Sequence, residues 1–318
     1  MMLLRRAQVV VGVALLATWF VSGCASTKPN KRVREDPRGA YTWALERIQD
    51  GKCLNASETL RLLSLEQTGV PYVDSIVYYL AQAYACLGDH ALAQVEYQRV
   101  VNQYPSSALV DDAAFGMAYA QFMQAPKNPG LDQQLAEHSI ASLEDFIAIY
   151  PLSDRRKEAL ALLSDMKNRL AKKAFDSGRL YLKLHADSSA MIYFQQLWDE
   201  YTESPYAARA LWLLAEKERH RENWEGAIQR YEQLIAVYPE AVEVDQSKML
   251  LERIKTDQAK KMHQEADRAR ERGDLDLAVS KYEALLGQFP NYAKTPEVKK
   301  DLEGVQLELA TRDTAAHP

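Results

Sequence analysis

The sequence lacks a hydrophobic run long enough to cross a bilayer. Its most apolar stretch, residues 9–21, has 13 residues, whereas a membrane-spanning helix needs about 20. Two arginines precede this stretch, and its last residue begins the segment VSGC at 21–24. A basic start, a short apolar segment and small residues before a cysteine are typical of a bacterial lipoprotein signal. The sequence therefore predicts a signal peptide over 1–23 and a lipidated Cys24.

Lipidation of Cys24 would supply the membrane anchor, as a diacylglycerol and an N-acyl chain such as palmitate. Each buried methylene group contributes about 0.8 kcal/mol, so several chains hold firmly. The next residue is Ala25, whereas Asp at this place typically retains lipoproteins in the inner membrane. We therefore expect a protein of the outer membrane that faces the periplasm. Residues 24–39 contain two prolines and five basic residues, which predicts a flexible tether.

Signature motifs of enzymes are also missing. The sequence has no Gly-x-Gly-x-x-Gly, phosphate-binding loop, Gly-x-Ser-x-Gly, His-Glu-x-x-His or Cys-x-x-Cys. Its six histidines never form a pair four residues apart. We expect no catalytic residue, no metal and no cofactor apart from the lipid. Removing 1–23 leaves 37 basic and 44 acidic residues, and this acidity argues against nucleic acid as a partner.

What the chain does contain is a repeat. Three segments read alike: GDHALAQVEYQRVVNQYP (88–105), ENWEGAIQRYEQLIAVYP (222–239) and GDLDLAVSKYEALLGQFP (273–290). Each holds an alanine, an aromatic residue four positions later and a closing proline. A small residue lets two helices approach, the aromatic ring fills the groove between them, and proline stops the helix. The repeat-core positions are Ala93, Tyr97 and Pro105; Ala227, Tyr231 and Pro239; and Ala278, Tyr282 and Pro290.

Weaker copies of the repeat extend it along the chain. Their key positions are Ala56 and Leu60, Ser139 and Leu143, and Ala190 and Phe194, with Gly178 in a preceding first helix. Segments 153–185 and 240–272 are charged and nearly free of proline and glycine, which indicates long helices between hairpins. The sequence thus predicts an all-α fold. We expect a right-handed α-solenoid of about six tetratricopeptide-like hairpins.

The repeat register also places two cysteines and a group of tyrosines. Cys53 follows the turn of the first hairpin and Cys86 precedes the turn of the second, so the two can face each other. A disulfide stays open, but we favour two buried free thiols. Tyr78, Tyr79 and Tyr84 fall on the first helix of the second hairpin, and Tyr41 opens the solenoid. These four are candidate contacts for a peptide or partner, while packing between hairpins is the alternative.

The layout resembles the BamD (YfiO/ComL) lipoproteins. The segments that carry the resemblance are LDQQLAEHSIASLEDFIAIYPLSDRRKEALALLSDMKNRLAKKAFDSGRLYLKL (131–184) and SSAMIYFQQLWDEYTESPYAARAL (188–211). The similarity as a whole spans roughly 40–240. The resemblance implies a non-enzymatic adaptor of the outer-membrane β-barrel assembly machine. Its N-terminal hairpins would bind unfolded barrel precursors, and its C-terminal hairpins would bind a BamA-like barrel subunit, alongside other lipoproteins of the machine.

We divide the mature chain accordingly. Hairpins one to three occupy 40–151 and hairpins four and five occupy 152–239. An additional helical hairpin at 240–311 extends past the family pattern, and 312–318 is predicted to be a disordered tail. The alternative function is a tetratricopeptide lipoprotein that acts as a pilotin or an envelope scaffold.

Overall fold

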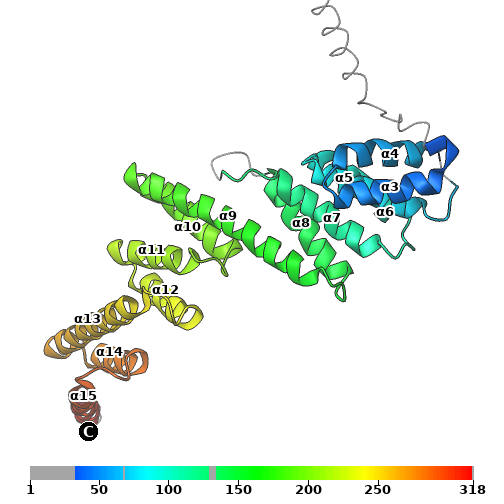
Figure 1. Ribbon diagram of the computed structural model, residues 1–318. Helices are drawn as coiled ribbons and strands as arrows, with labels where there is room; N and C mark the ends of the chain where they lie inside the picture. Colours follow the sequence, from blue (N-terminus) through cyan, green and yellow to red (C-terminus); the bar gives the residue numbers. More distant parts are fainter. Residues whose placement is uncertain (1–32, 67–68, 129–133, 317–318) are drawn as a thin grey trace, which may run out of the picture. The chain divides into compact units, whose positions relative to one another are not determined.

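The computed structural model describes residues 33–66, 69–128 and 134–316 (Figure 1). Within these ranges the chain forms thirteen α-helices and no β-strand. The predicted all-α solenoid of helical hairpins is therefore confirmed. The signal peptide and Cys24 lie outside the described residues.

The helices follow one another in pairs, and most of them have 13 to 16 residues. They are α3 (Pro37–Gln49), α4 (Cys53–Glu66), α5 (Val73–Cys86), α6 (His90–Gln103), α7 (Val110–Gln124), α8 (Gln134–Ile149), α9 (Arg156–Lys183), α10 (Asp187–Glu200), α11 (Ala207–His220), α12 (Trp224–Val237), α13 (Val244–Glu271), α14 (Leu275–Gln288) and α15 (Thr295–Ala316). Consecutive helices contact each other from α3 to α8 and from α10 to α15. Each hairpin buries its apolar faces against its neighbours in the chain.

The chain divides into two compact units, residues 1–166 and 167–318. The division falls inside α9, whereas the sequence placed a boundary after residue 151. Ala159, near the start of α9, belongs to the core around α7 and α8. Ala171 and Ala174 belong to the core around α10 and α11. One 28-residue helix thus supplies both cores, and α13 is a second helix of the same length.

Small residues under large side chains hold the hairpins together. Each of the six second helices places a small residue at zero exposure and a large one, four positions later, at 0 to 6% exposure. The small residues are Ala56, Ala93, Ser139, Ala190, Ala227 and Ala278; the large ones are Leu60, Tyr97, Leu143, Phe194, Tyr231 and Tyr282. The six hairpins read from the sequence correspond to these six helices and the helices that precede them.

Two first helices use glycine where a ring approaches their backbone. A Cβ atom on Gly116 of α7 would lie 2.6 Å from the Tyr97 ring. A Cβ atom on Gly178 of α9 would lie 2.6 Å from the Phe194 ring. Because these distances are far below van der Waals contact, only glycine admits the ring at either place.

The aromatic–proline pairs end the second helices, and their aromatic residues pack against the core while their prolines do not. The aromatic residues that cap α6, α12 and α14 have φ between −127° and −129° and ψ between 54° and 65°. The prolines that follow are all exposed, namely Pro105, Pro239 and Pro290. The expectation that they belong to the repeat core is wrong. Proline stops the helix by disfavouring helical backbone in the residue before it, and this effect needs no burial.

Among the described residues, five of the turns inside the hairpins share one left-handed position. Glycine fills it in three turns, at Gly51 (φ 72°), Gly88 (φ 79°) and Gly273 (φ 76°). His185 (φ 57°) and Glu222 (φ 59°) fill it in two others. A side chain at positive φ is strained, so these two turns are less favourable than their glycine counterparts.

The predicted tether over 24–39 is too long at its C-terminal end. Val33 is fully buried in the core of α3, α4 and α5. Asp36 caps α3, because its carboxylate accepts a hydrogen bond from the Gly39 amide at 2.9 Å, and Pro37 occupies the first helical position. The segment DPRG is therefore a helix start.

The predicted disordered tail is also corrected. Helix α15 continues through Ala316, so residues 312–316 are helical, while 317–318 lie outside the described residues. No proline or glycine interrupts this segment, and Arg312 pairs with Asp276 of α14 at 3.3 Å. The extra region 240–311 contains the hairpin α13–α14, and α15 packs on α14 as a terminal helix.

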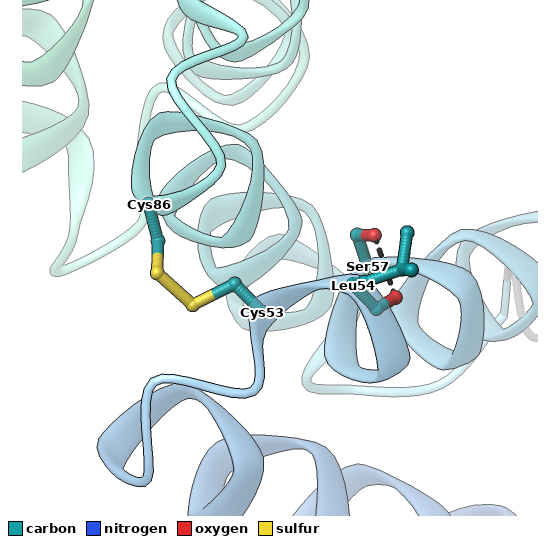
Figure 2. Close-up of a disulfide and its surroundings, with 4 residues drawn as sticks. All are labelled: Cys53, Leu54, Ser57 and Cys86. Carbon is teal, nitrogen blue, oxygen red and sulfur yellow. Dashed lines mark hydrogen bonds between the residues drawn. A yellow bond between two sulfur atoms is a disulfide. The ribbon is translucent and has the colours of Figure 1, made fainter.

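Cys53 and Cys86 form a disulfide, which corrects the expectation of two buried free thiols (Figure 2). Cys53 begins α4 and is 2% exposed, whereas Cys86 ends α5 and is exposed. Since α4 and α5 pack against each other, the start of one helix meets the end of the next. Their Cα atoms are 6.1 Å apart, within the range that a disulfide spans. The bond links the first hairpin to the second.

Replacing both disulfide cysteines by alanine should destabilise unit 1. The bond closes a loop with a sequence separation of 33, and chain entropy for such a loop predicts a loss of about 3 to 4 kcal/mol. Urea unfolding with and without dithiothreitol, in a Cys24→Ala background, measures this. Dithiothreitol should lower the midpoint of the protein that keeps both cysteines and leave the double variant unchanged. Two reactive thiols in the native, unreduced protein would contradict the disulfide.

Replacing Glu222 by glycine should stabilise unit 2 by about 0.5 to 1 kcal/mol, because glycine relieves the positive φ. Gly273→Ala is the matched opposite change, and it should destabilise the equivalent turn by a similar amount. Guanidinium unfolding of both variants gives the two free-energy changes. Equal signs for the two substitutions would show that the turn conformation does not set their effect.

Candidate partner-binding surfaces

A row of tyrosine rings runs along the first helices of the two N-terminal hairpins. Tyr41 of α3 lies 5.4 Å from Tyr72, at the start of α5, and 6.2 Å from Tyr79 of α5, measured between ring centroids. Tyr79 in turn lies 5.3 Å from Tyr78, edge to face. Helix α3 contacts α5, and α5 contacts α7, in addition to their neighbours in the chain. The row therefore follows a side of unit 1 where first helices meet.

The row has an accessible edge and a buried edge. Tyr41, Tyr72 and Tyr79 are half-buried, while Tyr78 is 6% exposed and packs 5.7 Å from Tyr97. The Gln82 side chain donates a hydrogen bond to the Tyr78 hydroxyl at 2.9 Å. Tyr78 is therefore a packing residue, and the three half-buried rings are the candidate contact residues.

Of the four tyrosines singled out in the sequence, Tyr84 lies apart from this row. It is half-buried and packs between the cores of the first and second hairpins. Tyr72 was not among the candidates, because it lies just before α5 and so outside the helix that the repeat pattern predicts. The structure adds it through its contact with Tyr41.

The Tyr41 hydroxyl stays neutral. Burial and the neighbouring Tyr79 raise the pKa of Tyr41 to about 12. Asp74, beside the row at the start of α5, accepts hydrogen bonds from the Ser107 hydroxyl at 2.6 Å and the Ser75 amide at 2.8 Å. Asp74 thus fixes the start of α5 against the segment before α7.

Unit 2 carries a second candidate surface, a hollow of about 490 Å³ formed by α10, α11 and α12. Met191 and Leu214 contribute apolar side chains to it, and Ile192 is 68% exposed at its edge. Polar side chains around them are linked to one another: Arg230 donates to Gln195 at 3.0 Å, and Gln195 donates to Asp199 at 2.8 Å. An apolar patch with a connected polar rim is the usual composition of a protein interface.

A comparison with known sequences shows the family to which the chain belongs. The sequence model of YfiO, described as an outer membrane lipoprotein, matches residues 34–222. That span is more than half of the chain. The chain belongs to the YfiO family. This confirms the resemblance read from the sequence, over nearly the same residues.

Individual relatives agree with the family. The outer membrane protein assembly factor BamD of Caulobacter vibrioides is 23% identical over 206 residues, which cover 64% of this chain and 67% of that protein. A tetratricopeptide-repeat model matches residues 209–241, which contain α12 and all but the first two residues of α11.

Solved structures with similar helical repeats include the TPR2AB domain of yeast Sti1, with a TM-score of 0.35. It is 12% identical and the match covers 84% of this chain and 97% of that one. A tetratricopeptide-repeat protein from Parabacteroides merdae gives a TM-score of 0.30 at 12% identity, with coverages of 84% and 98%.

The tyrosine row lies inside the part of the chain that matches the YfiO family, whereas α13, α14 and α15 lie beyond it. No helix among the described residues is long and apolar enough to cross a membrane.

In the helices beyond the family match, the structure groups His263 with Asp267 and Asp301. The chain has no two histidines four residues apart, and the signal in the sequence is instead a histidine and a carboxylate at that spacing on α13.

Proposed function

We propose that this YfiO-family chain is a non-enzymatic adaptor of outer-membrane β-barrel assembly, anchored by lipid on Cys24 and facing the periplasm. Family membership supports a role in outer-membrane protein assembly. The observation that carries the finer proposal is the half-buried row of Tyr41, Tyr72 and Tyr79. These rings lie on the N-terminal hairpins, for which the family resemblance implies precursor binding.

The row suits an unfolded barrel precursor on chemical grounds. Barrel strands alternate apolar and polar residues and carry aromatic residues at both membrane interfaces. An aromatic side chain of the precursor would meet ring faces and edges here, and each such pair contributes about 0.5 to 1.5 kcal/mol beyond the area it buries. The tyrosine hydroxyls would also reach polar backbone groups of an extended chain. A few contacts of this size give binding weak enough for the precursor to be passed on.

The hollow of unit 2 is the proposed docking place for a BamA-like barrel subunit. Its support is the exposed Ile192 beside the linked polar groups Gln195, Asp199 and Arg230. This composition suits a folded partner, because a folded surface can satisfy the rim groups in fixed geometry. Other lipoproteins of the machine complete the proposed partner set.

Crosslinked pull-down of the membrane-anchored protein tests the assignment. The unaltered protein should capture a BamA-like barrel and barrel precursors. Tyr41→Ala with Tyr79→Ala removes two ring contacts, worth about 1 to 3 kcal/mol, so precursor capture should fall roughly 5- to 150-fold while the barrel subunit is retained.

Tyr193→Ala is the matched control, since this half-buried ring stacks on Tyr181 in unit 2, 5.3 Å away, and belongs to no part of the row. It should leave precursor capture unchanged. Capture of a secretin or a cell-wall synthase in place of a BamA-like barrel would favour the pilotin or scaffold alternative. Equal precursor capture by all variants would remove the tyrosine row from the mechanism.

Cys24→Ala should abolish the anchor, because no thiol remains to carry the diacylglycerol. The variant should shift from the outer-membrane fraction to the soluble periplasmic fraction, or accumulate with its signal peptide uncleaved. Membrane fractionation and mass spectrometry of the N-terminal peptide measure this. Ser22→Ala keeps a small residue before the cysteine and serves as the control. A Cys24→Ala protein that stays in the outer membrane without lipid would refute the lipoprotein assignment.

A further inference from the structure

One buried histidine in the C-terminal extension has no hydrogen-bond partner for the Nε2 atom of its ring. His263 of α13 has a side chain that is 7% exposed, and its Nε2 atom is buried without a hydrogen bond. The ring is held edge to face between Tyr282 and Tyr292, with centroid distances of 6.1 Å to each. A buried polar atom without a partner is costly and calls for an explanation.

Two carboxylates face this nitrogen at equal distance. Nε2 lies 3.6 Å from Oδ1 of Asp267, one turn further along α13, and 3.6 Å from Oδ2 of Asp301 on α15. Both distances are too long for an N–H···O hydrogen bond. They are close to the roughly 3.3 to 3.4 Å that separates two ligand atoms of one tetrahedral ion with bonds of 2.0 to 2.1 Å.

Neighbouring groups orient both carboxylates and leave the facing oxygens available. The Tyr282 hydroxyl donates to Asp267 Oδ1 at 2.6 Å, and this oxygen keeps a second lone pair. Arg270 approaches the other oxygen of Asp301, Oδ1, at 3.7 Å. Hydrogen bonds and charges of this kind are what hold metal ligands in position.

The charge at the site favours a cation. The one guanidinium beside the two carboxylates, that of Arg270, also pairs with Glu308, so the charge around the nitrogen is negative, and the imidazole supplies a nitrogen ligand. Asp267 and Asp301 have side chains that are 45% and 29% exposed, so an ion and a water ligand can enter from solvent. One nitrogen and two oxygen ligands suit Zn²⁺ or a similar divalent transition ion, whereas Mg²⁺ and Ca²⁺ prefer oxygen ligands alone.

We propose that His263, Asp267 and Asp301 form a binding site for a divalent transition metal ion, with Zn²⁺ as the best fit. The site joins α13 to α15 across α14, so the ion ties the terminal helix to the last hairpin. It lies beyond residues 34–222, which match the YfiO family. The inference is independent of the proposed function.

Titration calorimetry with ZnCl₂ tests the proposal on the full chain, purified in detergent without a histidine tag and stripped with EDTA. One Zn²⁺ should bind saturably, and MgCl₂ should bind far more weakly. His263→Gln and Asp301→Asn remove ligands and should each weaken Zn²⁺ binding by tenfold or more. Tyr282→Phe removes only the hydrogen bond that orients Asp267, and a loss of about 10- to 100-fold is typical of such partners.

Asp276→Asn is the matched control. Asp276 also pairs with α15, through Arg312, but belongs to no part of the proposed site, so Zn²⁺ affinity should not change. Asp301→Asn alters a partly exposed side chain and keeps the test valid if His263→Gln does not fold. Amide hydrogen exchange provides a second readout, in which Zn²⁺ should protect α15 in the unaltered chain and not in Asp301→Asn. Absence of saturable Zn²⁺ binding, or equal affinity in the unaltered chain and both ligand variants, overturns the proposal.

Discussion

The packing of a large side chain over a small residue is the constraint on which the rest of this structure depends. The ring of Tyr97 lies where a Cβ atom on Gly116 would clash, and the ring of Phe194 stands in the same relation to Gly178. Helix axes can come this close only where one side contributes almost no side chain. The second helix of each of the six hairpins repeats the arrangement with a fully buried alanine or serine. A hairpin built this way leaves apolar surface on its outer faces, so it must stack on a neighbour.

This packing decides which side chains remain for function. Successive helical residues point about 100° apart, so adjacent tyrosines on α5 meet different surroundings. Tyr78 packs against Tyr97 and is buried between the helices. Tyr79 packs against Tyr41 and remains partly exposed. The same segment of sequence therefore supplies a core residue and a candidate contact residue. Both are tyrosine, and composition alone cannot separate them.

The parts of the fold that the sequence predicts are those set by local spacing. An alanine or serine followed by a large residue four positions later marked all six second helices, and the near absence of proline and glycine marked α9 and α13. The disulfide was missed because the repeat register brings Cys53 and Cys86 to neighbouring positions but does not tell where the two Cβ atoms point. The prolines were assigned to the core because they recur with it, although they act only on the backbone before them. Val33 reads as part of a linker until the three helices that bury it are in place.

The C-terminal extension shows why site residues are harder to predict than helices. His263 and Asp267 share a helix face by their spacing alone, yet a surface pair of this kind is common and carries no function by itself. The pair becomes part of a three-residue cluster because α15 places Asp301, 38 residues beyond His263, near the same nitrogen. The buried imidazole then has two carboxylates within reach and a hydrogen bond to neither. Three helices are needed to create that situation, and no window of sequence contains them all. Spacing along one helix can therefore indicate a candidate pair of ligands. The third candidate ligand and the burial of the histidine come only from tertiary packing.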